Sequence, residues 1–202
     1  MYSVIKKTII SKMTWNIHQV AKPKIKNPVL IEGLPGIGNV GKIAADFMID
    51  TLKAKKLLEI TSYTFPHCVF VNQKNIVELP TIEVFYRNYK DHTLLLLAGD
   101  IQPLNETSCY EFCDEVLNLI EKQQGKKEII TLGGIAMKKN PPSPQVYSAA
   151  NNHRIRKKYA QNVRGGMYGL VGPIVGVSGL LVGLAGKRKI SAISLLAETW
   201  GH

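Results

Sequence analysis

Four runs of apolar residues stand out along the chain, each with the length and the branched side chains of a buried strand. They cover residues 28–32, 93–98, 128–132 and 190–197. Because both faces of such a run are apolar, each predicts a strand inside a parallel sheet. Helical periodicity follows the first two runs. One helix is predicted after Gly41, with apolar positions at Ile43, Ala44, Phe47, Met48 and Leu52, and another over 107–124.

The order of these elements is strand, turn, helix, strand, which is the βαβ pattern of α/β folds. Shorter alternating runs at 68–71, 76–79 and 82–86 predict antiparallel strands between the first two long runs. We therefore expect an α/β fold, with a mixed sheet that is parallel at its centre and carries helices on both faces. Residues 13–202 are expected to form one domain, and residues 1–12 a basic N-terminal extension.

One stretch of 22 residues, from Gly165 to Gly186, carries no charge and has the length of a membrane span. Its eight glycines and Pro173 favour another interpretation. They divide it into a buried strand over 173–177, a helix cap at Ser178 and a short helix over 179–185. No membrane partner is expected.

Composition places the chain among ordinary globular domains: of its 202 residues, 45% are hydrophobic and 20% are charged. This excludes a disordered, collagenous or disulfide-stapled protein. The three cysteines form no CxxC pair, which indicates a reducing, cytoplasmic location and no zinc site. Cys109 and Cys113 lie four residues apart on the apolar face of the helix over 107–124, so we expect them in the core. No metal site is predicted.

The formal charge of +11 is unevenly distributed. Residues 1–31 and 129–197 contain basic groups and no acid, whereas residues 32–128 carry fourteen acids against ten basic groups. Such segregation favours steering of a partner or a second subunit. The densest basic cluster, residues 153–159, holds a single aromatic ring, which is more typical of a solvated helix face than of a nucleic-acid surface. Nucleic-acid binding by the basic ends remains a third, lesser hypothesis.

The turn between the first long strand and its helix, residues 33–42, is rich in glycine. Gly36, Gly38 and Gly41 satisfy the GxGxxG pattern of dinucleotide-binding folds, and Gly36 to Lys42 also satisfies GxxxxGK. A P-loop, which binds a nucleoside triphosphate, needs a hydroxyl after its lysine to hold Mg²⁺. Ile43 stands at that position, so the P-loop interpretation fails. Two interpretations stay open: glycines that permit close packing of helix on sheet, or an anion site.

Three carboxylates follow predicted strands: Glu32, Asp100 and Glu198. The carboxyl ends of parallel strands are where α/β sheets bind ligands. These side chains could act as bases or hold a cation, or they could cap turns and pair with Lys42.

A nucleophile elbow at Ser178 is excluded because Leu180 replaces the last glycine of GxSxG, and no catalytic residue is assigned. The possible ligand or anion site comprises Glu32, Gly33, Gly36, Gly38, Asn39, Gly41, Lys42, Asp100 and Glu198.

Five segments, in this order and spacing, resemble the proteasome assembly chaperone 2 family in its archaeal form. They are residues 28–42, 94–103, 131–136, 172–185 and 195–199. The resemblance implies a phosphorylase-like α/β sandwich, oligomerisation and binding to proteasome α subunits as an ATP-independent assembly factor. No cofactor is expected. Family members that dock on proteasomes end in a hydrophobic-Tyr-any tail, whereas this sequence ends in Trp200-Gly201-His202. The usual C-terminal helices and tail are thus expected to be missing.

Two functions therefore follow as hypotheses. The first is a non-enzymatic, homo-oligomeric assembly chaperone or scaffold whose partners are copies of itself and proteasome α subunits. The alternative is a ligand-binding protein or enzyme that uses the Gly33–Lys42 turn for a nucleotide or another phosphate-bearing molecule, in line with the ATP-grasp-like ligase label that some relatives have carried. An enzyme is thus left open but not favoured.

Overall fold

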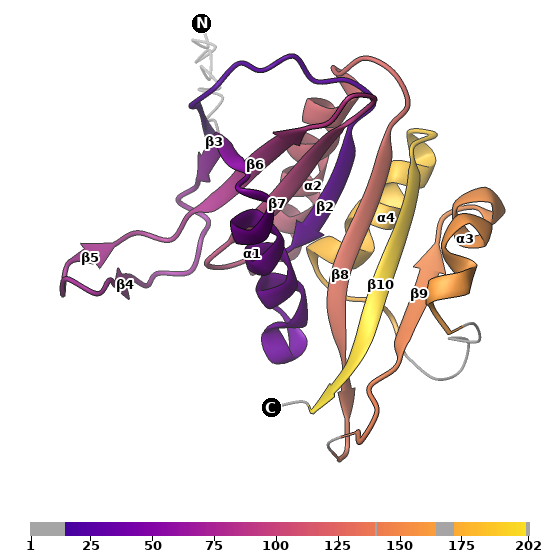
Figure 1. Ribbon diagram of the computed structural model, residues 1–202. Helices are drawn as coiled ribbons and strands as arrows, with labels where there is room; N and C mark the ends of the chain where they lie inside the picture. The colour runs from indigo at the N-terminus through magenta and orange to yellow at the C-terminus, as the bar shows by residue number, and fades with distance from the viewer. Residues whose placement is uncertain (1–14, 140, 165–171, 201–202) are drawn as a thin grey trace, which may run out of the picture.

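The structure is a computed structural model that describes residues 15–139, 141–164 and 172–200. Its centre is an eight-stranded mixed sheet in the order β1-β3-β6-β7-β2-β8-β10-β9 (Figure 1). The strands are β1 (Asn16–Gln19), β2 (Val29–Gly33), β3 (Lys55–Thr61), β6 (Ile82–Asn88), β7 (Thr93–Gly99), β8 (Glu128–Met137), β9 (Val146–Ala150) and β10 (Ser191–Trp200). A separate pair, β4 (Phe70–Val71) and β5 (Val77–Glu78), forms a small second sheet.

The predicted parallel centre is confirmed. Strands β7, β2, β8 and β10 run parallel, and they coincide with the four apolar runs of the sequence. Antiparallel strands flank them on both sides, β6, β3 and β1 beyond β7 and β9 beyond β10. Strands β8 and β10 each extend beyond the predicted run, because the residues that follow continue the parallel pairing as far as Met137 and Trp200.

Helices cover both faces of this sheet, as predicted. α2 (Glu106–Glu121) and α4 (Val177–Lys187) pack side by side behind the sheet in Figure 1. α1 (Val40–Leu52) and α3 (His153–Tyr159) lie on the opposite face. Ile155 of α3 contacts Ile130 and Ile193, which alternate along their strands with residues facing α2 and α4. Two 3₁₀ turns, Ile37–Asn39 and Ala160–Asn162, complete the described elements.

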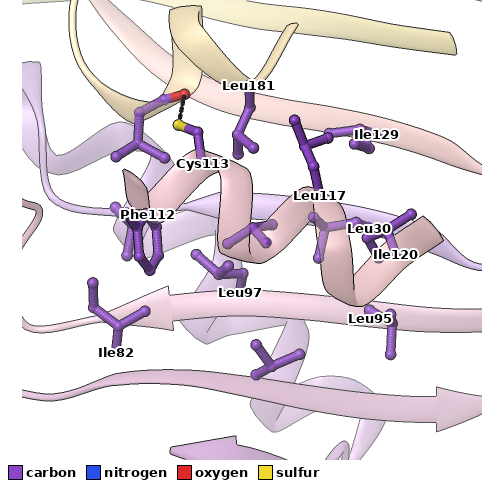
Figure 2. Packing of buried hydrophobic residues seen from close by; sticks show 14 of the residues in the cluster. Leu30, Ile82, Leu95, Leu97, Phe112, Cys113, Leu117, Ile120, Ile129 and Leu181 are labelled. Atoms are coloured by element: carbon purple, nitrogen blue, oxygen red, sulfur yellow. Dashed lines mark hydrogen bonds between the residues drawn. The ribbon is translucent and has the colours of Figure 1, made fainter. Parts of the chain in front are cut away.

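The main core lies between α2 and the sheet. Phe112, Leu117 and Ile120 of α2 are fully buried against strand residues such as Leu30 and Leu97 (Figure 2). Asn105 begins this helix by accepting a hydrogen bond from the Ser108 amide at 2.8 Å. Cys109 and Cys113 lie on the buried face, which confirms their predicted place in the core.

The glycine-rich stretch over 172–187 differs from the prediction. Residues 172–176 form no strand, and α4 begins at Val177 with Gly176 at its N-cap, so Ser178 lies inside the first turn rather than at the cap. Gly176 occupies a positive φ of 84°, a conformation that a side-chain cap residue rarely adopts. Residues 165–171 lie outside the described part. No helix among the described residues is long and apolar enough to cross a membrane.

The outward face of α1 also differs from the prediction. The helical spacing of Ile43 and Phe47 is typical of a core-facing surface, but these side chains are 64% and 69% exposed. The residues that face the sheet are Gly41 and Ala45. A Cβ on Gly41 would lie 2.5 Å from the Leu132 carbonyl oxygen, so the helix approaches the sheet too closely for large side chains.

Candidate functional site

The turn from β2 into α1 is built by close backbone contacts. A Cβ on Gly33 would lie 2.2 Å from the Gly41 carbonyl oxygen and 2.7 Å from the Ala45 Cβ. Gly38 has a φ of +61°, and a Cβ there would lie 2.7 Å from the Thr199 side chain. Gly33, Gly38 and Gly41 are therefore accounted for by packing of the turn and helix on the sheet. At Gly36, in contrast, an added Cβ would have no heavy atom within 4 Å.

Of the two polar residues of the predicted site in this turn, Lys42 is engaged within α1 and Asn39 is not. The Lys42 ammonium forms an ion pair with Asp46 at 2.6 Å, one turn further along the helix. Asn39 precedes α1 with a left-handed φ of 52°, and its side chain makes no capping hydrogen bond. Lys42 thus does not pair with any of the three strand-end carboxylates, contrary to one of the alternatives left open by the sequence.

Glu32 is the most unusual side chain of the predicted site. It lies in β2 and is fully buried. One carboxylate oxygen accepts a hydrogen bond from the Leu34 amide at 3.0 Å, and the other accepts one from the Ser178 hydroxyl at 2.9 Å. Burial raises the pKa of the Glu32 carboxyl to about 7, although both hydrogen bonds act in the opposite direction. Burial therefore moves the titration of this carboxyl close to neutral pH.

Asp100 and Glu198 each cap a neighbouring backbone segment. Asp100 accepts hydrogen bonds from the amide and the hydroxyl of Thr81, at 3.1 and 3.4 Å. Glu198 accepts from the Gln145 amide at 3.0 Å and from the Tyr147 hydroxyl at 3.1 Å. Both carboxylates therefore hold the ends of antiparallel strands in place.

The three carboxylates are not brought together. In the β8 register, Glu32 is opposite Thr131 and Glu198 is opposite Ile135. Four residues along a strand correspond to roughly 13 Å. Asp100 lies three residues beyond Leu97, which is the β7 partner of Glu32. Among the described residues, no group of three or more His, Cys, Asp or Glu side chains could hold a metal ion.

A cavity of about 1000 Å³ lies beside the turn. Its walls come from residues 34–37, the end of β8, the segment over 172–176 and the start of α2. Most of the lining is apolar, and Ser178 connects it with the buried Glu32. Gln102 holds the rim together because its amide nitrogen donates to the Pro35 carbonyl at 2.9 Å and its oxygen accepts from the Val177 amide at 3.4 Å.

Sequence reasoning missed this cavity and the link between Glu32 and Ser178. The two residues are separated by 146 positions. The sequence placed Glu32 among the strand-end carboxylates of a possible ligand site and Ser178 at a helix cap. The only available signal was that Glu32 is a charged residue inside an otherwise apolar strand run, which requires a buried partner.

A second cavity, of about 730 Å³, lies at the opposite edge of the sheet between α3 and the start of β10. Its lining includes six basic residues and two acids. Both acids are paired: Glu128 with Lys158 at 2.8 Å, and Glu121 with Arg188 at 3.0 Å. The basic cluster over 153–159 thus forms one wall of an electropositive surface.

Comparison with known proteins identifies the family. The model of the PAC2 family matches residues 30–202, so the chain belongs to this family, and the predicted resemblance to the proteasome assembly chaperone 2 family is confirmed. Two proteins of Methanocaldococcus jannaschii are similar in sequence, both described as uncharacterized. MJ1210 is 32% identical over 183 residues, which is 88% of this chain and 68% of that protein. MJ0106 is 29% identical over 188 residues, which is 90% and 70% of the two chains.

Solved structures show the same fold. The crystal structure of Pyrococcus furiosus PbaB, described as an archaeal proteasome activator, has a TM-score of 0.85 and 33% identity, and the match covers 94% of this chain and 82% of that one. Pyrococcus furiosus PbaA, described as an archaeal homolog of proteasome-assembly chaperone, has a TM-score of 0.75 and 24% identity over 93% and 74% of the two chains. The second likeness concerns the fold alone.

Proposed function

We propose that this protein is a cytoplasmic, homo-oligomeric assembly chaperone or scaffold that acts on proteasome α subunits without ATP. The observation that carries the proposal is membership of the PAC2 family together with the similarity to PbaB, a described proteasome activator, over nearly the whole chain. The relatives of unknown activity do not contribute to it.

The contacts of these predicted site residues support a role without catalysis. Gly33, Gly38 and Gly41 are used for close packing, and Lys42 pairs with Asp46. Asp100 and Glu198 hold backbone segments. Each of these residues therefore has a structural task, and none of them needs a substrate to satisfy its charge or its backbone conformation.

The test is binding to purified α subunits from a proteasome-bearing archaeon. The full chain is immobilised, incubated with α subunits with and without ATP and Mg²⁺, and the bound protein is quantified. We expect the same amount of α subunit in both conditions. Binding that requires ATP would overturn the ATP independence, and no binding in either condition would overturn the chaperone function. Light scattering of the chain alone measures the oligomeric state.

A phosphate-bearing ligand at the Gly33–Lys42 turn is the second candidate. The observation that favours it is that Gly36, Ile37 and Gly41 line the cavity of about 1000 Å³ at the start of α1. Gly36 is the one glycine of the GxGxxG pattern that close packing does not require. An anion near the helix start would be stabilised by the helix dipole, although the nearby Glu32 carboxylate opposes it above neutral pH.

A further inference from the structure

Residues 67–79, which we call the arm, form a hairpin that projects from the sheet between β3 and β6 (Figure 1). The pairs Phe70–Glu78 and Val71–Val77 form its short ladder. Asn72 fixes the turn, because its side-chain oxygen accepts hydrogen bonds from the amides of Lys74 and Ile76 at 2.9 and 3.1 Å. The arm is thus a defined element rather than an irregular loop.

The sides of the arm are apolar and exposed. Six of its aliphatic and aromatic side chains are between 42% and 73% exposed, namely Val69, Phe70, Val71, Ile76, Val77 and Leu79. β4 and β5 have their principal contacts with each other. A two-stranded hairpin without a packed face is marginal in water, and a contiguous exposed apolar patch marks an interaction surface. The arm therefore presents apolar side chains to solvent as a candidate interaction surface.

A second exposed apolar surface lies on α1. Ile43 and Phe47 are one helical turn apart and point away from the sheet, and Ile37 in the preceding turn is 48% exposed. The ion pair between Lys42 and Asp46 flanks them. We call Ile37, Ile43 and Phe47 the α1 face. Its apolar centre and polar border match the anatomy of a protein interface.

Charge favours these two surfaces over the rest of the chain as the place where two copies meet. The chain carries +11, so two copies repel each other over most of their surface. The arm contains one lysine and one glutamate, and α1 contains one lysine and two aspartates. These two apolar surfaces thus lie in the part of the chain without excess positive charge, where two copies meet with the least repulsion.

We propose that the arm of one copy packs on the α1 face of a second copy. In a two-fold arrangement the exchange is reciprocal, so each contact occurs twice. This doubling helps two small patches approach the roughly 800 Å² per partner that stable interfaces bury. The inference rests on the self-association included in the proposed function and goes beyond it by assigning the contact surfaces.

The test uses charged substitutions at exposed positions, which leave the fold intact. Val71→Lys in the arm and Phe47→Glu on the α1 face should each weaken self-association by about 30-fold or more, measured by light scattering over a range of concentrations. An equimolar mixture of the two variants should recover much of the association, because one of its two contacts is wild-type and the other joins the new lysine to the new glutamate.

Val20→Lys and Val20→Glu serve as matched controls, because Val20 is 51% exposed and lies outside both surfaces. They should associate like the wild type. Unchanged association of Val71→Lys would overturn the inference and leave the proposed function standing. Loss in Val71→Lys but not in Phe47→Glu, or no recovery in the mixture, would overturn the α1 face as the docking surface. A monomeric wild type would overturn both the inference and the homo-oligomeric part of the proposed function, whereas α-subunit binding is scored separately.

Discussion

The Ser178 hydroxyl donates a hydrogen bond of 2.9 Å to the fully buried carboxylate of Glu32, and this contact joins the first turn of α4 to the central strand β2. The Leu34 amide occupies the other carboxylate oxygen. Ser178 lines the cavity, and burial raises the pKa of the Glu32 carboxyl to about 7. A change in the protonation of Glu32 should therefore affect both the stability of the domain and the polarity near the base of the cavity.

The stability of the domain should fall as the pH rises from about 4.5 to about 7, because of Glu32. Burial raises the pKa of this carboxyl from 4.5 to about 7, so the native state retains a proton that the unfolded chain releases. Between pH 4.5 and about 7 this difference lowers the free energy of unfolding by about 3 kcal/mol, and above that range it has no further effect. Urea unfolding of wild type and Glu32→Gln at pH 5 and pH 8 measures it. The variant should lose this contribution; equal pH dependence of the two proteins would contradict the prediction.

Ser178→Ala should destabilise the domain more at pH 8 than at pH 5. At pH 8 the hydroxyl donates to an ionised, buried carboxylate, and such a bond contributes about 1.5–3 kcal/mol. At pH 5 the carboxyl is neutral and the loss should be about half as large. A double-mutant cycle with Glu32→Gln isolates the pair. A coupling free energy close to zero at pH 8 would show that the contact does not stabilise the fold.

Gly33→Ala and Gly41→Ala should each destabilise the fold by roughly 1–3 kcal/mol, because the new methyl group meets backbone atoms that cannot move independently. Gly183→Ala is the matched control: it lies in α4 with no atom within 4 Å of its Cβ position, and it should stabilise the helix by about 0.5–1 kcal/mol. Thermal unfolding of the three variants measures the order. Equal stabilities for the three would contradict the packing role of the turn.

One of the three cysteines should react with a thiol reagent in the folded, dilute protein. Cys68 is exposed, whereas Cys109 and Cys113 are buried. Burial raises the pKa of both buried thiols, so the reactive thiolate is scarce as well as inaccessible. Titration with a chromogenic disulfide should give one thiol in buffer and three in denaturant. Rapid reaction of a second thiol under native conditions would indicate local opening of α2.

ATP with Mg²⁺, and inorganic phosphate, should leave the melting temperature unchanged under the ATP-independent function. A ligand that binds the native state at a concentration 100 times its dissociation constant would stabilise it by about 2.7 kcal/mol, which shifts the melting temperature by several degrees. Differential scanning fluorimetry at millimolar ligand measures this. A concentration-dependent rise with ATP or phosphate would instead favour the phosphate-bearing ligand at the turn, and Gly36→Asp should then abolish that rise.

The sequence by itself determined the central sheet and the core helices. The four apolar runs became β2, β7, β8 and β10, and the periodicity around Cys109 and Phe112 became the buried face of α2. These elements were predictable because hydrophobic burial acts on whole segments, and its period of two or 3.6 residues can be recognised without knowledge of any partner. The ordered motifs likewise identified the family.

Tertiary structure decided what each apolar or polar residue touches. Ile43 and Phe47 follow the helical period of a core-facing surface, but the close approach at Gly41 turns them outward. Ser178 has the local features of a cap, yet its partner is Glu32, 146 residues away. The arm was predicted as antiparallel strands, but its separation from the main sheet was not. Periodicity defines the faces of an element, whereas the choice of neighbour depends on packing distances that only the assembled chain fixes.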